Sequence, residues 1–257
     1  MGNTLCFGIT PYPSPLTSSP SSTRCYTYYG GEGEYVPIEA TEVIIHHSVT
    51  TIKYCISGYR SPFRGCTSLV KVTMPDTVTR IEEPYGGGGI FKNCTSLKSI
   101  RLSRNLEFIG TGTFAFCTSL ESVFLPPTIK QIKCHAFIHC KSLRILSLPE
   151  SMQLIGNEII LGCPKLLRTV QYRYKGGEYL SNNNEVNLWL QRQYDKFPLH
   201  KICYSTRVTV QMIEDCIQRH GKEYAAKMDA LGMLAIDVLK ANPHATPEAI
   251  EACEAAR

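Results

Sequence analysis

The chain has 257 residues, of which 43% are hydrophobic and 19% are charged, so it can bury a core and is not disordered throughout. It has no apolar run of about eighteen residues, which argues against a membrane-spanning helix. Twelve cysteines are few for a disulfide-stapled scaffold of this length, and the N-terminus does not resemble a secretory signal. We therefore expect free thiols and a cytoplasmic protein.

The positive charge lies mostly in the middle of the chain. Lys and Arg total 27 against 22 Asp and Glu, a net charge of +5. Residues 43–166 alone hold fourteen basic and seven acidic residues, a net of +7. Such a segment can attract nucleic acid, anionic lipid or an acidic protein, but it is also typical of an ordinary solvated face. Charge alone leaves the class of partner open.

The N-terminal segment is dominated by proline and serine, as in PYPSPLTSSPSSTR. A stretch of this composition cannot bury enough apolar surface to order itself. We predict a disordered tail over residues 1–34.

A cysteine recurs at one position of an internal repeat. Cys-x-Ser-Leu occurs four times, a degenerate Cys-Pro-Lys-Leu follows, and the spacings are 28, 23, 23 and 23 residues. The five cysteines are Cys66, Cys94, Cys117, Cys140 and Cys163. A unit of this length cannot bury its own apolar face, so neighbouring units must stack. The spacing predicts a solenoid of parallel strands with a column of buried cysteines.

Each unit contains two extended pieces and a tight turn. The stretch Leu-x-x-Ile-x-Leu-Pro fits a short strand that proline ends, because proline cannot continue a ladder of hydrogen bonds. A second short extended piece is expected around Ile109, Ile132 and Ile155. The residues from there to each cysteine fit a tight helical turn.

The repeat resembles the BspA-like class of leucine-rich repeats. One unit matches the pattern of that family at Ile109-Gly110, Phe114, Cys117, Ser119-Leu120, Val123 and Leu125-Pro126. The resemblance implies an α/β repeat solenoid over residues 35–172, curved and right-handed, that binds other proteins. Three positions depart from the pattern: Ile160 replaces Phe, Lys133 replaces Gly, and Ser103 stands where Pro is usual.

The C-terminal part has a different period. Residues 173–184 are expected to form a linker, and residues 185–257 a small all-α region. There Thr209, Ile213 and Cys216 recur 37 residues later as Thr246, Ile250 and Cys253. Pro198-Leu199-His200 resembles the opening of an ankyrin repeat. We predict two ankyrin-like helix pairs that dock on the end of the solenoid through a helix around Trp189.

One cluster has the residue types of a zinc site. Cys134, His135, His139 and Cys140 lie within seven residues. The repeat register places Cys140 in the core and the two histidines on the surface, so we predict no metal. His200 is expected to have a structural role, and we find no catalytic motif. The sequence therefore predicts no enzyme and no cofactor.

The candidate binding surface is the outward stripe of the strands. Residues that alternate with the buried strand positions should face outward together, and Phe124 and Ile145 beside Arg101 have the composition of a protein-binding hot spot. The predicted partner-binding residues are Lys71, Thr73, Ser99, Arg101, Ser122, Phe124, Ile145, Ser147 and Arg168.

We therefore predict a non-enzymatic scaffold that binds a protein partner through the leucine-rich repeat sheet. Two alternatives stay open: binding of nucleic acid or an acidic partner through the basic solenoid, and a cell-surface adhesin. The chain lacks stacking aromatics interleaved with arginine, which favours a protein over a nucleic acid. The partner's identity and the oligomeric state are not predicted.

Overall fold

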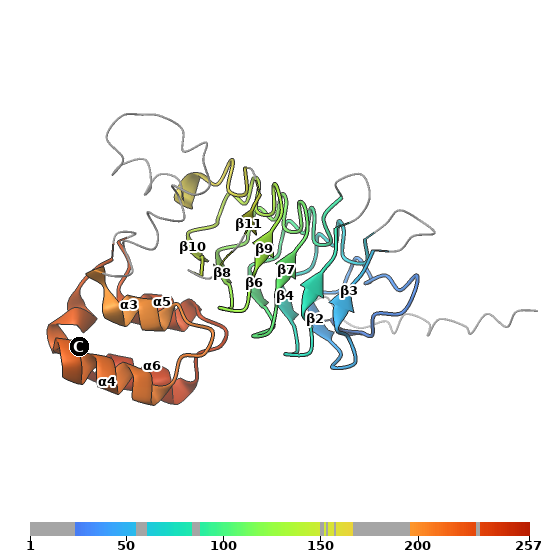
Figure 1. The fold of residues 1–257 in the computed structure, drawn as a ribbon. Coiled ribbons are helices and arrows are strands. Elements are labelled where there is room, and N and C mark those ends of the chain that lie inside the picture. The colour runs from blue at the N-terminus through green and yellow to red at the C-terminus, as the bar shows by residue number, and fades with distance from the viewer. Residues whose placement is uncertain are drawn as a thin grey trace, which may run out of the picture.

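The computed structural model describes residues 24–54, 61–83, 88–149, 152, 154–156, 158–166, 196–229 and 232–257. Its N-terminal part is a solenoid of two parallel sheets, and a helical region follows (Figure 1). Sheet A comprises β1 (Cys25–Tyr28), β2 (Glu42–Ile45), β4 (Lys71–Thr73), β6 (Ser99–Arg101), β8 (Ser122–Phe124) and β10 (Ile145–Ser147). Sheet B comprises β3 (Thr51–Ile52), β5 (Arg80–Ile81), β7 (Phe108–Ile109), β9 (Gln131–Ile132) and β11 (Leu154–Ile155).

The strands are parallel and in register from repeat to repeat, which confirms the predicted solenoid. The central residue of each three-residue strand in sheet A points into the core and is buried. Val72, Ile100, Val123 and Leu146 occupy this position. Because side chains alternate across a strand, the two residues beside each central one face away from the core.

Two columns of side chains fill the turns between sheet B and sheet A. The rings of Phe91, Phe114 and Phe137 stack at centroid distances of 5.3 and 5.4 Å. The five repeat cysteines are all buried, which confirms the predicted column. Each thiol donates a hydrogen bond to a main-chain carbonyl of the preceding repeat, as Cys140 Sγ does to Phe114 O at 3.1 Å. The cysteine therefore acts as a small apolar side chain that also ties two repeats together.

The sheet begins earlier than the sequence indicated. β1 pairs with β2 along its whole length, from Cys25↔Glu42 to Tyr28↔Ile45. These residues fall within the range 1–34 that we predicted to be a tail. The Pro/Ser composition ends before Cys25, and the alternation Cys-Tyr-Thr-Tyr places Tyr28 in the core at 2% exposure. Residues Cys25–Tyr28 therefore form a strand of sheet A, although we predicted them to be disordered.

Gly110 shows why the repeat pattern contains glycine after its second strand. A Cβ at this position would lie 2.7 Å from the main chain of Glu82 and Glu83 in the preceding repeat. The main chains of adjacent turns approach too closely there for a side chain. The equivalent residue in the next repeat is Lys133, half-buried, so this approach is not the same in every unit.

The C-terminal region contains two helix pairs, α3 (Pro198–Cys203) with α4 (Val210–His220) and α5 (Ala235–Ala241) with α6 (Pro247–Ala255). A short 3-10 helix, η1 (Lys222–Ala226), follows α4. Threonine caps the N-terminus of both α4 and α6: the hydroxyls of Thr209 and Thr246 accept hydrogen bonds from the main chain of Met212 and Ala249. In Figure 1, α3 lies beside α5, and α4 lies beside α6 in a second layer.

The helical region packs against the C-terminal repeats of the solenoid. Phe124 of β8 and Ile145 of β10 belong to the same apolar cluster as Leu199, Tyr204 and Leu239 of the helical region. The helices therefore cover the outward face of sheet A at β8 and β10. Trp189, through which we predicted docking, and the linker at 173–184 lie outside the described residues.

Candidate functional site on the outward face of sheet A

The predicted stripe forms two adjacent rows of residues across sheet A. One row runs from Lys71 to Ser99 to Ser122 to Ile145. The other row contains Thr73, which pairs with Arg101, and Phe124, which pairs with Ser147. Eight of the nine predicted residues lie in these rows, while Arg168 lies outside the described residues.

Two further residues extend these rows, and the sequence analysis missed them. Glu42 pairs with Lys71, and Ile44 pairs with Thr73. Ile44 is an exposed aliphatic side chain, with 47% of its surface accessible. The alternation of buried and outward-facing residues in Glu42–Ile45 could have identified both residues from the sequence. The irregular spacing between Ile52 and Cys66 concealed its register with the later repeats.

Phe124 and Ile145 are not exposed, so our expectation of an exposed hot spot at these residues is wrong. Their accessible fractions are 1% and 0%, and Ser122 and Ser147 are buried beside them. The physical reason is the helical region, whose Tyr204 ring lies 6.3 Å from the Phe124 ring. The apolar composition does mark a contact surface, but the chain itself occupies it.

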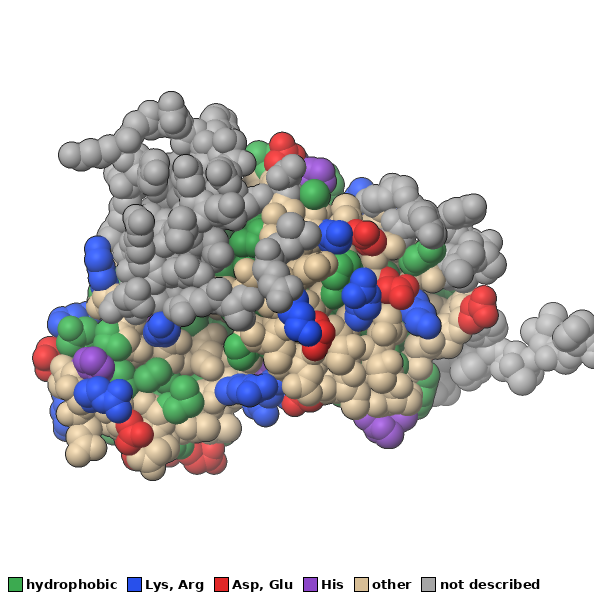
Figure 2. All heavy atoms as spheres, in the orientation of Figure 1, with side chains coloured by type: hydrophobic (Ala, Val, Ile, Leu, Met, Phe, Trp, Pro, Cys, Tyr) green, Lys and Arg blue, Asp and Glu red, His purple; other side chains and the backbone are tan. Residues whose placement is uncertain are grey.

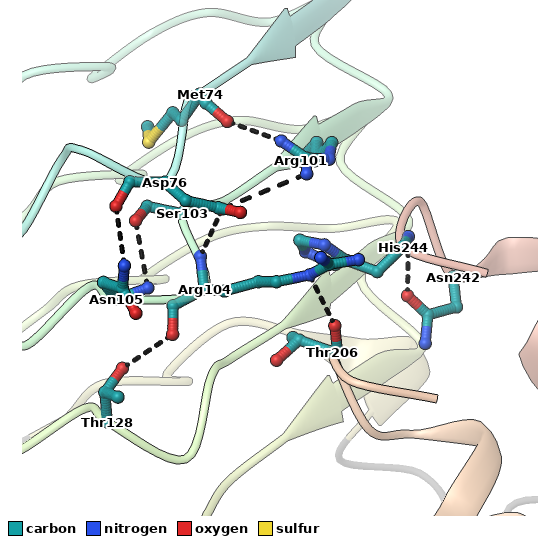
Figure 3. A network of polar contacts seen from close by, with 10 residues as sticks. All are labelled: Met74, Asp76, Arg101, Ser103, Arg104, Asn105, Thr128, Thr206, Asn242 and His244. Carbon is teal, nitrogen blue, oxygen red and sulfur yellow. Dashed lines mark hydrogen bonds and ion pairs between the residues drawn. The ribbon is translucent and has the colours of Figure 1, made fainter. Parts of the chain in front are cut away.

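A polar network joins the solenoid to the helices at the edge of this contact (Figure 3). Arg104 Nε donates a hydrogen bond to Thr206 O at 3.0 Å, across the junction. The main-chain N–H of Arg104 donates to Asp76 Oδ1 at 2.9 Å, and Arg101 Nη1 donates to Met74 O at 2.7 Å. Arg101, predicted to bind a partner, is therefore held by its own repeat array beside the docked helices.

His244 is a buried histidine at the same junction. It is 4% exposed, and neither ring nitrogen has a hydrogen-bond partner in the described part of the chain. Burial, together with the nearby guanidiniums of Arg101 and Arg104, lowers the pKa of His244 to about 4, and only Asp76 opposes this shift. The imidazole of His244 is thus neutral at pH 7, so the contact between helices and solenoid buries no charge at this residue.

The exposed half of the face carries charges of both signs. Lys71 Nζ lies 3.9 Å from Glu42 Oε2, and Arg101 Nη2 lies 3.9 Å from Asp76 Oδ1. Figure 2 shows basic and acidic side chains interleaved over the solenoid in this view. A phosphate backbone needs a run of uncompensated positive charge. The pairing across repeats therefore does not favour the outward face of sheet A as a nucleic-acid surface.

The residues of the candidate zinc cluster do not converge. Cys140 Sγ is directed at Phe114 O, His135 Nε2 lies 2.9 Å from Glu158 Oε2, and the His139 ring packs 4.9 Å from the Phe116 ring. Among the described residues, no group of three or more His, Cys, Asp or Glu side chains could hold a metal ion.

Cys66 and Cys117, two of the buried repeat cysteines, are poor nucleophiles. Burial raises the pKa of the Cys66 thiol to about 12 and that of Cys117 well above its usual range. His200 is likewise buried, and its Nε2 lies 2.8 Å from Met233 O. The contacts of these thiols and of His200 are thus structural.

No helix in the described residues is long and apolar enough to cross a membrane.

The geometry defines a class of protein: a solenoid of short parallel strands with one outward sheet face half covered and half open. A family model for the BspA type leucine rich repeat region matches residues 35–167, in six copies. The match covers more than half of the chain, so the chain belongs to this family. It has one copy more than the five repeats that the cysteines marked. It ends before the helical region, so the ankyrin-like interpretation is not supported by it.

Solved structures of several bacterial leucine-rich repeat proteins are similar to part of the chain. A leucine rich repeat protein of T. pallidum has 27% identity and a TM-score of 0.43, over 55% of this chain and 60% of that one. A leucine rich cell surface protein of Faecalibacterium prausnitzii has 29% identity and a TM-score of 0.44, over 50% of this chain and 32% of that one. The chain thus spans less than two thirds of either. No curated protein matches the chain.

Proposed function

We propose that this protein is a non-enzymatic scaffold that binds a protein partner on the open half of the outward face of sheet A. The open half consists of the outward residues of β2, β4 and β6. These residues are Glu42, Ile44, Lys71, Thr73, Ser99 and Arg101.

The observation that supports this proposal is that the same face already binds a folded element at its other half. At β8 and β10 the two outward rows pack on helices with almost complete burial. At β2 and β4 the same rows carry an exposed aliphatic residue, Ile44, in the row next to the charged pair Glu42–Lys71. An apolar centre with a polar rim is the usual anatomy of a protein interface.

The rigid repeat array explains how such a surface would gain affinity. Backbone hydrogen bonds between repeats and stacked Phe and Cys columns hold each strand before a partner arrives. A preordered surface loses little conformational entropy on binding, so more of the contact energy appears as affinity. No catalytic step is needed for this role.

The proposal is tested with the full chain and a photo-crosslinking residue at position 44. A partner protein that is crosslinked from position 44 but not from position 130 is identified and purified. The Kd of this partner is then measured for the wild-type chain and for the variants Ile44→Glu and Lys71→Glu. We expect each substitution to raise Kd at least about tenfold, which is about 1.4 kcal/mol. Lys130→Glu, before β9, is the control and should leave Kd unchanged. Equal Kd values for all four proteins would exclude the open half as the binding surface.

A further inference from the structure

Each repeat passes through a left-handed residue directly before its cysteine. The five equivalent residues have φ between 58° and 76°, and they are Gly65, Asn93, Phe116, His139 and Gly162. At the first four, the main-chain N–H donates to a carbonyl of the next repeat at 2.7–2.9 Å. Because these bonds recur in four of the five units, the repeat sets the left-handed conformation and the side chain does not.

Phe116 is the least suited residue to this position. Glycine and asparagine accept a left-handed conformation readily, whereas a bulky side chain there is an outlier. Burial does not compensate, because Phe116 is 39% exposed. Neither the backbone nor the core therefore explains an aromatic ring at this point, and such local strain is typical of functional surfaces.

The Phe116 ring is the centre of a patch formed by neighbouring repeats. The His139 ring lies 4.9 Å from it on one side, and Lys92 Nζ lies 5.8 Å from its centroid on the other. Leu161, whose carbonyl accepts from His139 N, is 37% exposed in the following repeat. We call the surface made by residues 64–68, 92–96, 115–119, 138–142 and 161–165 the turn ridge.

The turn ridge differs in charge from the rest of the solenoid. Its charged residues are Arg64, Lys92, Lys141 and Lys165, and it contains no Asp or Glu. Within the described part of the chain, the first three form no ion pair with a carboxylate, unlike Lys71 on sheet A. Glu158, which borders the ridge, is hydrogen-bonded to His135.

We propose that the turn ridge is a second interaction surface, which binds an acidic protein segment that carries an aromatic or large aliphatic side chain. That side chain packs on Phe116 and Leu161, while the carboxylates of the segment pair with Lys92 and Lys141. Single-stranded nucleic acid is a poorer fit, because it stacks on several successive exposed aromatics and this ridge has one, Phe116, beside one histidine. The turn ridge lies apart from the outward residues of sheet A, so the inference goes beyond the proposed function.

The test selects peptides from a random dodecapeptide display library. The library is first depleted on the Phe116→Asn variant and then panned against the wild-type full chain, so that the recovered peptides depend on Phe116. We expect the recovered peptides to be acidic and to contain an aromatic or large aliphatic residue. By fluorescence polarisation, Phe116→Asn should raise their Kd at least about tenfold and Lys92→Gln about threefold. Lys130→Gln removes the same charge outside the ridge and should change nothing. Ile44→Glu should also leave these peptides bound, which separates this test from that of the open half.

Three results with these variants would overturn the proposal. Recovery of only neutral or basic peptides, or of none that depend on Phe116, would overturn it. Binding of oligo-dT that depends on Phe116 would replace it with a nucleic-acid surface. The thermal midpoint gives the third: Phe116→Asn should keep or raise Tm, because asparagine suits the left-handed position. A fall in Tm of several degrees would show that the ring is structural.

Discussion

The two halves of the outward face of sheet A occupy the same repeat positions and have opposite surroundings. At β4, Lys71 and Thr73 are in contact with solvent, whereas at β10 the equivalent Ile145 and Ser147 are buried under helices. The strands on the two halves are parallel and in register. The difference therefore comes from what docks on the face and not from the repeat itself. A face that holds one folded element at β8 and β10 is a reasonable receptor for another at β2 and β4.

The largest effect should come from removing the apolar anchor of the covered half. Phe124→Ala deletes a ring that is 1% exposed, and we expect it to cost about 3–4 kcal/mol of the contact between solenoid and helices. Urea unfolding and limited proteolysis of α3–α6 measure the loss. Ile44→Ala is the matched control in the open half and should cost less than about 0.5 kcal/mol. Equal losses would mean that the two halves do not differ as described.

Acid should weaken the covered half and leave the open half unchanged. Docking lowers the pKa of His244 from 6.5 to about 4, through burial and two guanidiniums. Because the docked state disfavours the protonated imidazole, the contribution of His244 to stability is fully present above pH 6.5. It is lost as the pH falls towards 4, by an amount on the order of 2 kcal/mol. The pH dependence of unfolding between pH 7 and pH 4 measures it. His244→Gln should flatten the curve, and an unchanged curve would exclude His244 as its cause.

A smaller effect is expected at the polar edge of the contact. Arg104→Ala removes the hydrogen bond to Thr206 O and leaves that carbonyl at the buried junction without its donor. We expect a loss of about 1–2 kcal/mol in the docking of the helices. Arg207→Ala, an exposed arginine on the helical side, removes the same charge as a control. Hydrogen exchange of α5 and α6 should quicken in the first variant alone.

The smallest effect should be at the ion pair of the open half. Lys71→Gln breaks a pair with Glu42 that is 3.9 Å long and whose side chains are 54% and 38% exposed. Solvent and salt screen such a pair, so we expect a change below about 0.5 kcal/mol in unfolding free energy. A larger loss by urea titration would show that this half is part of the folding core and not an open surface.

The solenoid was readable from the sequence because one physical constraint repeats. A buried position every 23 residues must accept a small or apolar side chain each time, as Cys94, Cys117 and Cys140 do. The cysteine spacing did not predict the register of the strands where this constraint was interrupted. β1 has no cysteine turn of its own, and the segment between Ile52 and Cys66 carries an insertion, so Tyr28 and Ile44 were not assigned.

The binding stripe was only half readable. Alternation along a strand shows which residues face outward, and the register confirms it for Thr73 and Arg101. It does not show whether a distant segment covers them. Phe124 and Ile145 have the composition of an interface, and sequence alone could not say that α3–α6 of the same chain form the other side.

By itself, the sequence determined the period, the parallel stacking and the cysteine column. These follow from local geometry and from burial that recurs at fixed spacing. Only the tertiary structure decided which outward residues stay exposed and that His244 is enclosed beside Arg101 and Arg104. The physical reason is that accessibility at a strand position depends on contacts between residues more than 50 positions apart, such as Phe124 with Tyr204, and no local pattern encodes them.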